Sequence, residues 1–228
     1  MSFRFQLCIG TEYDPGIHSR VVSLVVDRYE MGPVGTNCYV VRAERGAAEA
    51  VVVDPGGDST DLRLDLARSG ARCRAIFVTH ADADHVAGVA DLAEGTGAAI
   101  YAPPRDAMPS ERASGWLAVR DYTVGTELTG GETLDVVGIA FEVLAIPGHS
   151  PDHVAFFADG CLFSGDLIFA NSVGRVDLAG GDWDTLIESA RILTERFPPE
   201  TTVYPGHGPA TTLGAERERN PYLAELRA

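Results

Sequence analysis

The chain has 228 residues, of which 45% are hydrophobic and 22% charged, enough to bury the core of one large domain or two small ones. Its net charge of −15 argues against a nucleic acid partner, because phosphate binding needs a basic face. No apolar run approaches the ~20 residues that cross a membrane, and we expect no signal peptide. The cysteines are scattered without a Cys-x-x-Cys pair, which is typical of a reducing cytoplasm (Cys8, Cys38, Cys73 and Cys161).

The first half of the chain reads as a run of strands and helices. Residues 1–19 have weak periodicity and are predicted to be an extension. Apolar patterning then predicts strands over 20–29, 37–43, 50–54, 74–79 and 98–102, and helices over 61–69 and 86–94. Residues 103–125 begin with a pair of prolines and are predicted to form an irregular excursion that shapes a pocket.

The second half repeats this order. Strands are predicted near 133–137, 139–146, 153–158, 160–164 and 201–204, and helices over 183–197 and 213–219. Strands in runs, with a helix after each half, predict two sheets packed together with helices outside. We therefore expect residues 20–228 to form a single domain of the α/β (α+β) class.

Chemically active side chains gather where the strand over 74–79 ends. Residues 79–85 read Thr-His-Ala-Asp-Ala-Asp-His, which places two histidines and two aspartates within six positions (His80, Asp82, Asp84 and His85). Neighbouring carboxylates repel one another without a cation, and imidazole and carboxylate are ligands that divalent metals prefer. The segment predicts half of a metal site.

Three later strands end in the same chemistry. His149, Asp166 and His207 each follow an apolar strand, in turns that contain glycine and, for the two histidines, proline. Such turns let the backbone bend sharply and present one side chain at the rim of a sheet. These residues predict the other half of the site. His153 lies four residues after His149, and we expect it behind the ligands, orienting a ligand or the substrate without touching metal.

This pattern resembles the metallo-β-lactamase superfamily, whose signature is His-x-His-x-Asp-His followed by Gly-His, Asp and a second Gly-His. Within it, the chain is most similar to short, single-domain glyoxalase II-type (hydroxyacylglutathione hydrolase-like) proteins. The segments that carry this likeness are 54–57 (Asp-Pro-Gly-Gly), 164–169, 173–177 and the tail 205–221. The resemblance implies a four-layer αββα sandwich with metals at one rim of the two sheets.

The resemblance also implies how the ligands are shared. The first metal would take His80, position 82 and His149; the second would take Asp84, His85 and His207; and Asp166 would bridge the two. The chain departs from the family at position 82, where Asp82 stands in place of a histidine. The second set is intact, whereas the first has lost an imidazole.

Asp82 leaves four interpretations open. It ligates, giving an oxygen-rich site that favours iron or manganese. It turns away, leaving His80, His149 and Asp166 as the facial triad of non-haem iron enzymes, like persulfide dioxygenases of this fold. The first position is weak or empty, with one metal in the second set. Lastly, Asp82 is only the N-cap of the following helix.

A metal-dependent hydrolase is the favoured function. A bound metal lowers the pKa of its water toward neutrality, so that the metal-bound water acts as nucleophile, and Asp84 orients it. No Gly-x-Ser-x-Gly motif offers a serine nucleophile. The resemblance implies a small-molecule thioester of the S-acylglutathione type, or of a related small thiol. Arg175 and Tyr39 are candidate contacts to an anionic substrate, and Arg175 is equally a candidate ion-pair partner of Asp177.

Other functions remain as alternatives: an iron persulfide dioxygenase, a lactone or other ester hydrolase, and a metal-binding module without catalysis. The expected cofactor is one or two divalent metal ions, with zinc first and iron or manganese as alternatives. The sequence leaves a homodimer open and does not identify the acyl group of the substrate.

Overall fold

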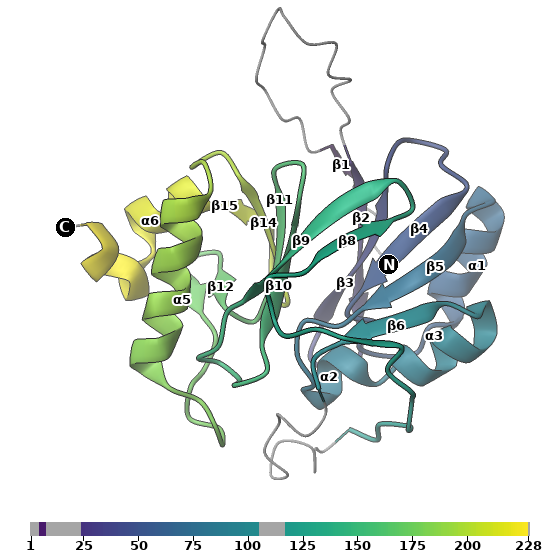
Figure 1. The fold of residues 1–228 in the computed structure, drawn as a ribbon, viewed down its shortest axis with the longest axis horizontal. Helices are drawn as coiled ribbons and strands as arrows, with labels where there is room; N and C mark the ends of the chain where they lie inside the picture. The colour runs from purple at the N-terminus through teal and green to yellow at the C-terminus, as the bar shows by residue number, and fades with distance from the viewer. Residues whose placement is uncertain (1–4, 8–23, 105–116, 228) are drawn as a thin grey trace, which may run out of the picture.

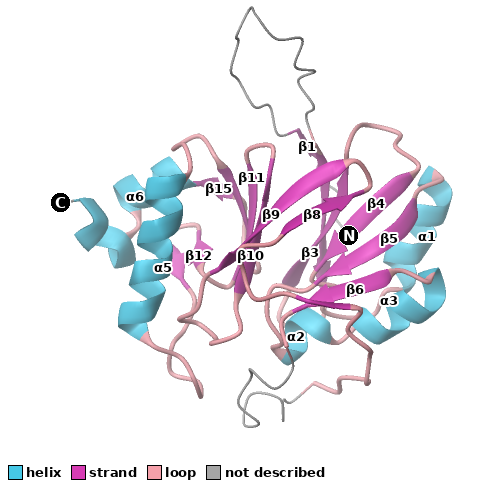
Figure 2. Cartoon of the chain, in the orientation of Figure 1, coloured by secondary structure: helices cyan, strands magenta, loops and turns pink. Residues whose placement is uncertain are grey.

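Two β-sheets pack face to face, with helices on both outer surfaces (Figure 1). The computed structural model describes residues 5–7, 24–104 and 117–227. The four layers follow one another in the order helix, sheet, sheet and helix (Figure 2). The predicted αββα sandwich is confirmed.

The first sheet follows the chain order β1-β2-β3-β4-β5-β6-β7. Its strands are antiparallel as far as β4 and parallel from β4 to β7. Their bounds are β1 (Phe5–Leu7), β2 (Val25–Met31), β3 (Thr36–Arg42), β4 (Glu49–Val53), β5 (Arg72–Phe77), β6 (Ala99–Ala102) and β7 (Thr126–Glu127). The helices of this half, on its outer side, are α1 (Thr60–Ser69), α2 (Ala83–Val86) and α3 (Val89–Thr96).

The second sheet has the order β15-β14-β11-β10-β9-β8. Its strands are β8 (Thr133–Val136), β9 (Ile139–Ala145), β10 (Val154–Ala158), β11 (Cys161–Gly165), β14 (Thr202–Pro205) and β15 (Thr211–Thr212). A small hairpin of β12 (Ile168–Phe169) and β13 (Ser172–Val173) follows β11. The outer helices are α5 (Trp183–Arg196), α6 (Leu213–Arg219) and the 3-10 segment η2 (Pro221–Arg227).

Three hydrophobic clusters join the four layers. The central cluster, between the sheets, holds a group of aromatic rings that includes Phe77, Phe141, Phe156 and Phe163. One outer cluster packs the first sheet on α1 and α3, and the other packs the second sheet on α5. Each sheet is covered on both faces, by the other sheet and by helices. Because successive side chains of a strand point to opposite faces, a strand such as β3 is buried along almost its whole length.

One predicted helix is interrupted. The helix expected over 86–94 is divided into α2 and α3, which meet at Gly88. A Cβ atom at Gly88 would lie 2.1 Å from the carbonyl oxygen of Gly57, and the Gly88 N–H donates to Pro55 O at 2.8 Å. The break lets the loop after β4 approach the helix, so a tertiary contact overrides the local periodicity.

Several expectations concern the edges of the domain. Of the predicted extension 1–19, residues Phe5–Leu7 form β1 and pair with β2, and the remainder lies outside the described residues. Of the excursion 103–125, residues 105–116 also lie outside them, and 117–125 contain no helix or strand. No described helix is long and apolar enough to span a bilayer. A cavity of about 570 Å³ lies beside α1, β2 and β3, on the outer face of the first sheet.

Candidate metal centre

The predicted ligands all follow strands that end at one rim. β4 and β5 run parallel in the first sheet, and β9, β11 and β14 run in one direction in the second. The loops after these strands meet at the same rim. The loop after β5 and the start of α2 bring His80, Asp82, Asp84 and His85; the loops of the second sheet bring His149, Asp166 and His207. Their donor atoms form three groups, in each of which the atoms lie within 4.8 Å of one another.

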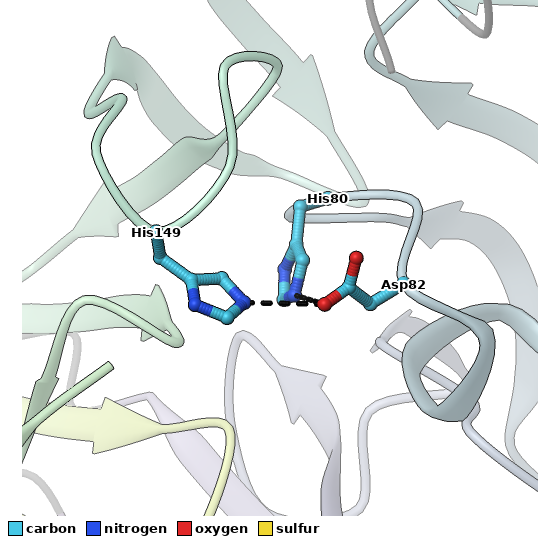
Figure 3. Close-up of side chains that lie close together, drawn as sticks. All are labelled: His80, Asp82 and His149. Atoms are coloured by element: carbon cyan, nitrogen blue, oxygen red, sulfur yellow. Dashed lines mark hydrogen bonds and ion pairs between the residues drawn. The ribbon is translucent and has the colours of Figure 1, made fainter. Parts of the chain in front are cut away.

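The first group is His80, Asp82 and His149. Figure 3 shows His149 facing His80 and Asp82 from a separate loop. Asp82 Oδ2 lies 3.2 Å from His149 Nε2 and 3.7 Å from His80 Nε2. Asp82 does occupy the N-cap position of α2, but its side chain makes no capping hydrogen bond. The carboxylate is therefore directed at the two imidazoles and not at the helix.

The second group is Asp84, His85 and His207. Asp84 Oδ2 lies 3.3 Å from His207 Nε2 and 3.8 Å from His85 Nε2. The hydroxyl of Thr36, at the start of β3, donates to the same oxygen of Asp84 at 2.9 Å. This group unites the two sheets, because His85 follows β5 and His207 follows β14.

Asp166 lies between these two groups and forms the third with His80 and His85. Its Oδ1 is 3.3 Å from His85 Nε2, and its Oδ2 is 3.5 Å from His207 Nε2 and 3.9 Å from His149 Nε2. One carboxylate thus reaches histidines of both sets, as a bridging ligand must.

Hydrogen bonds behind the site fix the histidine tautomers. Asp54 accepts from His85 Nδ1 at 3.0 Å and from the Thr79 hydroxyl at 2.7 Å. Since the Thr79 proton points to Asp54, the same hydroxyl must accept from His80 Nδ1, which lies 3.0 Å away. His149 Nδ1 donates to the carbonyl of Arg175 at 2.7 Å. Each of these imidazoles is left with Nε2 as an electron-pair donor toward the rim.

The electrostatics of the site call for a cation. Burial holds the pKa of His80 well below its ordinary value, so its ring is neutral. For Asp166, burial raises the pKa, but the charge of His85 and hydrogen bonds from His207 and His85 outweigh it and hold the pKa well below the usual range. Burial also raises the pKa of Asp84, and His207, His85 and Thr36 lower it more. Burial lowers the pKa of His85, but Asp166 and Asp54 outweigh burial and raise it well above its ordinary value, so a proton occupies this imidazole in the metal-free protein. A divalent metal that binds between the ionised carboxylates takes the place of such a proton.

The donor set therefore fits one or two divalent metal ions. The Nε2 atom of His80 is buried and finds no hydrogen-bond partner among the described residues, which is costly unless it ligates. Space at the centre is also kept open by glycine. A Cβ atom on Gly206 would lie 2.0 Å from Asp166 Oδ1 and 2.6 Å from His85 Cε1. Nitrogen and carboxylate oxygen donors suit zinc, iron and manganese alike.

The three remaining predicted residues are not members of these groups of donor atoms. Tyr39 is 2% exposed, packs in the central core and donates its hydroxyl to Pro205 O at 2.6 Å. The expected substrate contact of Tyr39 is therefore corrected: its side chain is committed to the core. Arg175 forms the alternative ion pair with Asp177, at 2.6 Å and 2.7 Å. His153 is buried with its ring centroid 4.6 Å from that of His80, yet its ring nitrogens form no hydrogen bond among the described residues.

Asp54 and Asn37 are among the residues that support the site and that the sequence did not indicate. Asp54 stands directly after β4, the same kind of place that singled out His80 and Asp166, so its position was a usable signal. Asn37 gave no signal, because it begins an apolar strand. Its backbone N–H donates to Gly206 O at 2.7 Å, and its side-chain amide donates to Pro205 O and Gly208 O, both at 2.8 Å. Asn37 thereby holds the loop that carries His207.

Comparison with solved structures finds the same fold. The B3 metallo-beta-lactamase BLEG-1 is 34% identical, with a TM-score of 0.79, and the match covers 87% of this chain and 99% of that one. The protein TTHA1623, solved in a di-iron-bound form, is 39% identical with a TM-score of 0.73, covering 86% and 99%.

The sequence comparisons agree. Hydroxyacylglutathione hydrolase GloC of Haemophilus influenzae is 29% identical over 197 residues, which cover 82% of this chain and 92% of that relative. A family model described as the metallo-beta-lactamase superfamily matches residues 31–207, the span that contains every strand-end ligand described above. The chain therefore belongs to the metallo-beta-lactamase superfamily, in which its relatives include metallo-hydrolases.

Proposed function

We propose that the protein is a thioester hydrolase that acts on S-acyl conjugates of glutathione or of a related small thiol, using a metal-activated water. The observation that carries this proposal is the pair of ligand groups joined by Asp166. Two neighbouring metal positions at an open rim are suited to hold a nucleophile and a substrate carbonyl together. When bound, the metal supplies a hydroxide near neutral pH and polarises the carbonyl.

The chain's own residues would prepare this reaction. Asp54 and Thr79 hold the rings of His85 and His80 with Nε2 toward the rim. Asp84 is kept ionised and is fixed by Thr36, so it is placed to orient the attacking water and to accept its proton. No serine or cysteine nucleophile is required for the acyl transfer.

Support for the substrate class comes from the relative in Haemophilus influenzae, which is named as a hydroxyacylglutathione hydrolase. The match covers most of this chain and most of that relative.

The position of Asp82 bears on the rival iron triad of His80, His149 and Asp166. That triad needs Asp82 to turn away, whereas its carboxylate lies 3.2 Å from His149 Nε2. The hydrolase is therefore preferred to a persulfide dioxygenase.

The test uses the purified full chain with its metal content measured. We expect the protein to hydrolyse S-lactoylglutathione. Exhaustive chelation should abolish this activity, and addition of zinc, iron or manganese should restore it. Oxygen uptake with glutathione persulfide, and hydrolysis of a lactone and of a β-lactam, are measured in parallel. Sulfite production without thioester hydrolysis would replace the proposal with the dioxygenase. Turnover of the lactone or the β-lactam alone would move it to another hydrolase class.

A further inference from the structure

A buried aspartate lies between the two loops that supply the first metal position. One loop, after β5, carries His80 and Asp82; the other, after β9, carries His149. Asp152 belongs to the second loop and is 7% exposed. A carboxylate is seldom buried unless its oxygens are hydrogen-bonded, so its contacts explain its place.

The two oxygens of Asp152 are divided between the loops. Oδ2 accepts from the backbone N–H of Ala81 at 3.1 Å. Oδ1 accepts a short hydrogen bond from the hydroxyl of Ser150, the residue next to His149. Ala81 stands between His80 and Asp82, and Ser150 is the neighbour of His149. The carboxylate of Asp152 therefore connects the backbone of the loop after β5 to the loop after β9.

Such a connection matters because of the residue at position 82. An aspartate side chain is shorter than a histidine side chain, so it reaches a shared metal only if the loop backbones lie close together. The observed 3.2 Å between Asp82 Oδ2 and His149 Nε2 is that close approach. We propose that Asp152 is a positioning residue that holds the two loops at the separation the short Asp82 ligand requires.

The second metal position is supported independently. His85 is held by Asp54, Asp84 by Thr36, and the His207 loop by Asn37, and none of these contacts passes through Asp152. Loss of Asp152 should therefore weaken the first position and spare the second. The inference rests on the proposed two-metal site but not on its substrate, because it is read from metal binding alone.

The experiment titrates zinc into metal-free full-length protein in competition with a chromophoric chelator. In Asp152→Ala we expect one of the two zinc-binding steps to lose about 10–100-fold in affinity, as is common for groups that orient ligands, while the other step is unchanged. Asp152→Asn keeps an oxygen for the Ala81 N–H and gains an amide that donates to the Ser150 oxygen. It should recover most of the lost affinity.

A control separates positioning from general destabilisation. Thr212 caps α6 by accepting from Ala215 N at 3.2 Å, and it pairs with Thr202 at the end of β14 remote from His207. Thr212→Ala should lower the melting temperature and leave both zinc steps unchanged. The inference is overturned if Asp152→Ala weakens both steps equally or neither, or if Asp152→Asn behaves like alanine. Failure of thioester hydrolysis in the wild-type protein would leave this result unaffected.

Discussion

Asp54 shows how one side chain governs both ligand groups. It contacts His85 directly and His80 through Thr79, so a ligand of each metal position has its ring orientation set by the same carboxylate. The Thr79 N–H also donates to Asp54 Oδ1 at 2.8 Å, so both oxygens are engaged. Its backbone adopts a φ of 49°, a left-handed conformation that is strained for a non-glycine residue, and such strain clusters at functional sites.

Asp54→Asn should weaken metal binding at both positions. An amide nitrogen meets a donor in either orientation: the Thr79 backbone N–H at the place of Oδ1, or His85 Nδ1 and the Thr79 hydroxyl at the place of Oδ2. At least one hydrogen bond behind the ligands is therefore lost. We expect a loss of about 10–100-fold in zinc affinity, measured by chelator competition. The matched control is Asp58→Asn on the same loop, whose exposed side chain accepts from the Thr60 N–H at 2.8 Å. Equal affinities in Asp54→Asn and wild type would contradict the role given to Asp54.

Asp82→His should change which metals the first position retains. The imidazole restores a nitrogen donor, so zinc occupancy should rise and manganese occupancy should fall. Elemental analysis of protein purified from zinc-rich and manganese-rich cultures measures both. If metal content and activity do not change, Asp82 is not a ligand.

At the scale of elements, the first residues of β3 connect the two sheets. Two neighbouring residues of β3 support the second metal position. Asn37 donates hydrogen bonds to the loop that carries His207, and Thr36 donates one to Asp84. An isolated bridge also pairs Thr36 with His207. The start of a buried strand thus sets the distance between ligands that arise from different sheets.

Asn37→Ala should destabilise the protein and loosen His207. The carbonyls of Pro205 and Gly208 would each lose one hydrogen bond, at a cost of about 0.5–1.5 kcal/mol per bond, while Pro205 O keeps the Tyr39 hydroxyl as a donor. Denaturant unfolding with and without zinc measures this loss, and the zinc-bound form should lose more. Tyr39→Phe removes only the hydroxyl bond to the same Pro205 carbonyl, so its effect should be smaller. A zinc affinity unaffected by Asn37→Ala would show that the loop does not depend on this anchor.

The sequence predicted those features that are encoded locally. Each ligand follows an apolar strand and stands within two residues of glycine, proline or another ligand, so His80, Asp84, His149, Asp166 and His207 were identifiable one at a time. Their convergence required only that parallel strands end at one rim.

The features that sequence could not predict depend on contacts between distant segments. Tyr39 lies in a strand that is buried on both faces, where an alternating pattern is absent and the inward face cannot be chosen. The division of the helix at Gly88 depends on the loop around Gly57. Asn37 and Asp152 form hydrogen bonds with residues far away in the sequence: Asn37 with Pro205, and Asp152 with Ala81.

At the scale of the whole molecule, zinc binding should strengthen as pH rises. In the metal-free protein burial lowers the pKa of His207, but Asp166 and Asp84 outweigh burial and raise it to about 9. The protonated ring therefore stabilises the metal-free fold fully below its unfolded pKa of about 6.5. That stabilisation is lost as pH rises through about 9.

Zinc must displace this proton from His207, so its affinity should increase as pH rises toward about 9 and level off above that value, with proton release on binding. Chelator competition at constant ionic strength, corrected for the chelator's own protonation, measures the trend. A zinc affinity that does not change with pH would contradict the raised pKa of His207.

The rim takes its donors from both halves of the chain, with four candidate ligands after β5 and three from loops of the second sheet. A cation bound there is a reversible cross-link between segments that are far apart in sequence, and it restricts the chain much as closing a long loop does. At this rim the ion would add to the hydrogen bonds that Asn37 and Tyr39 already make to the loop after β14. A chelator would consequently remove one of several links between the sheets and leave this end of the sandwich less rigid.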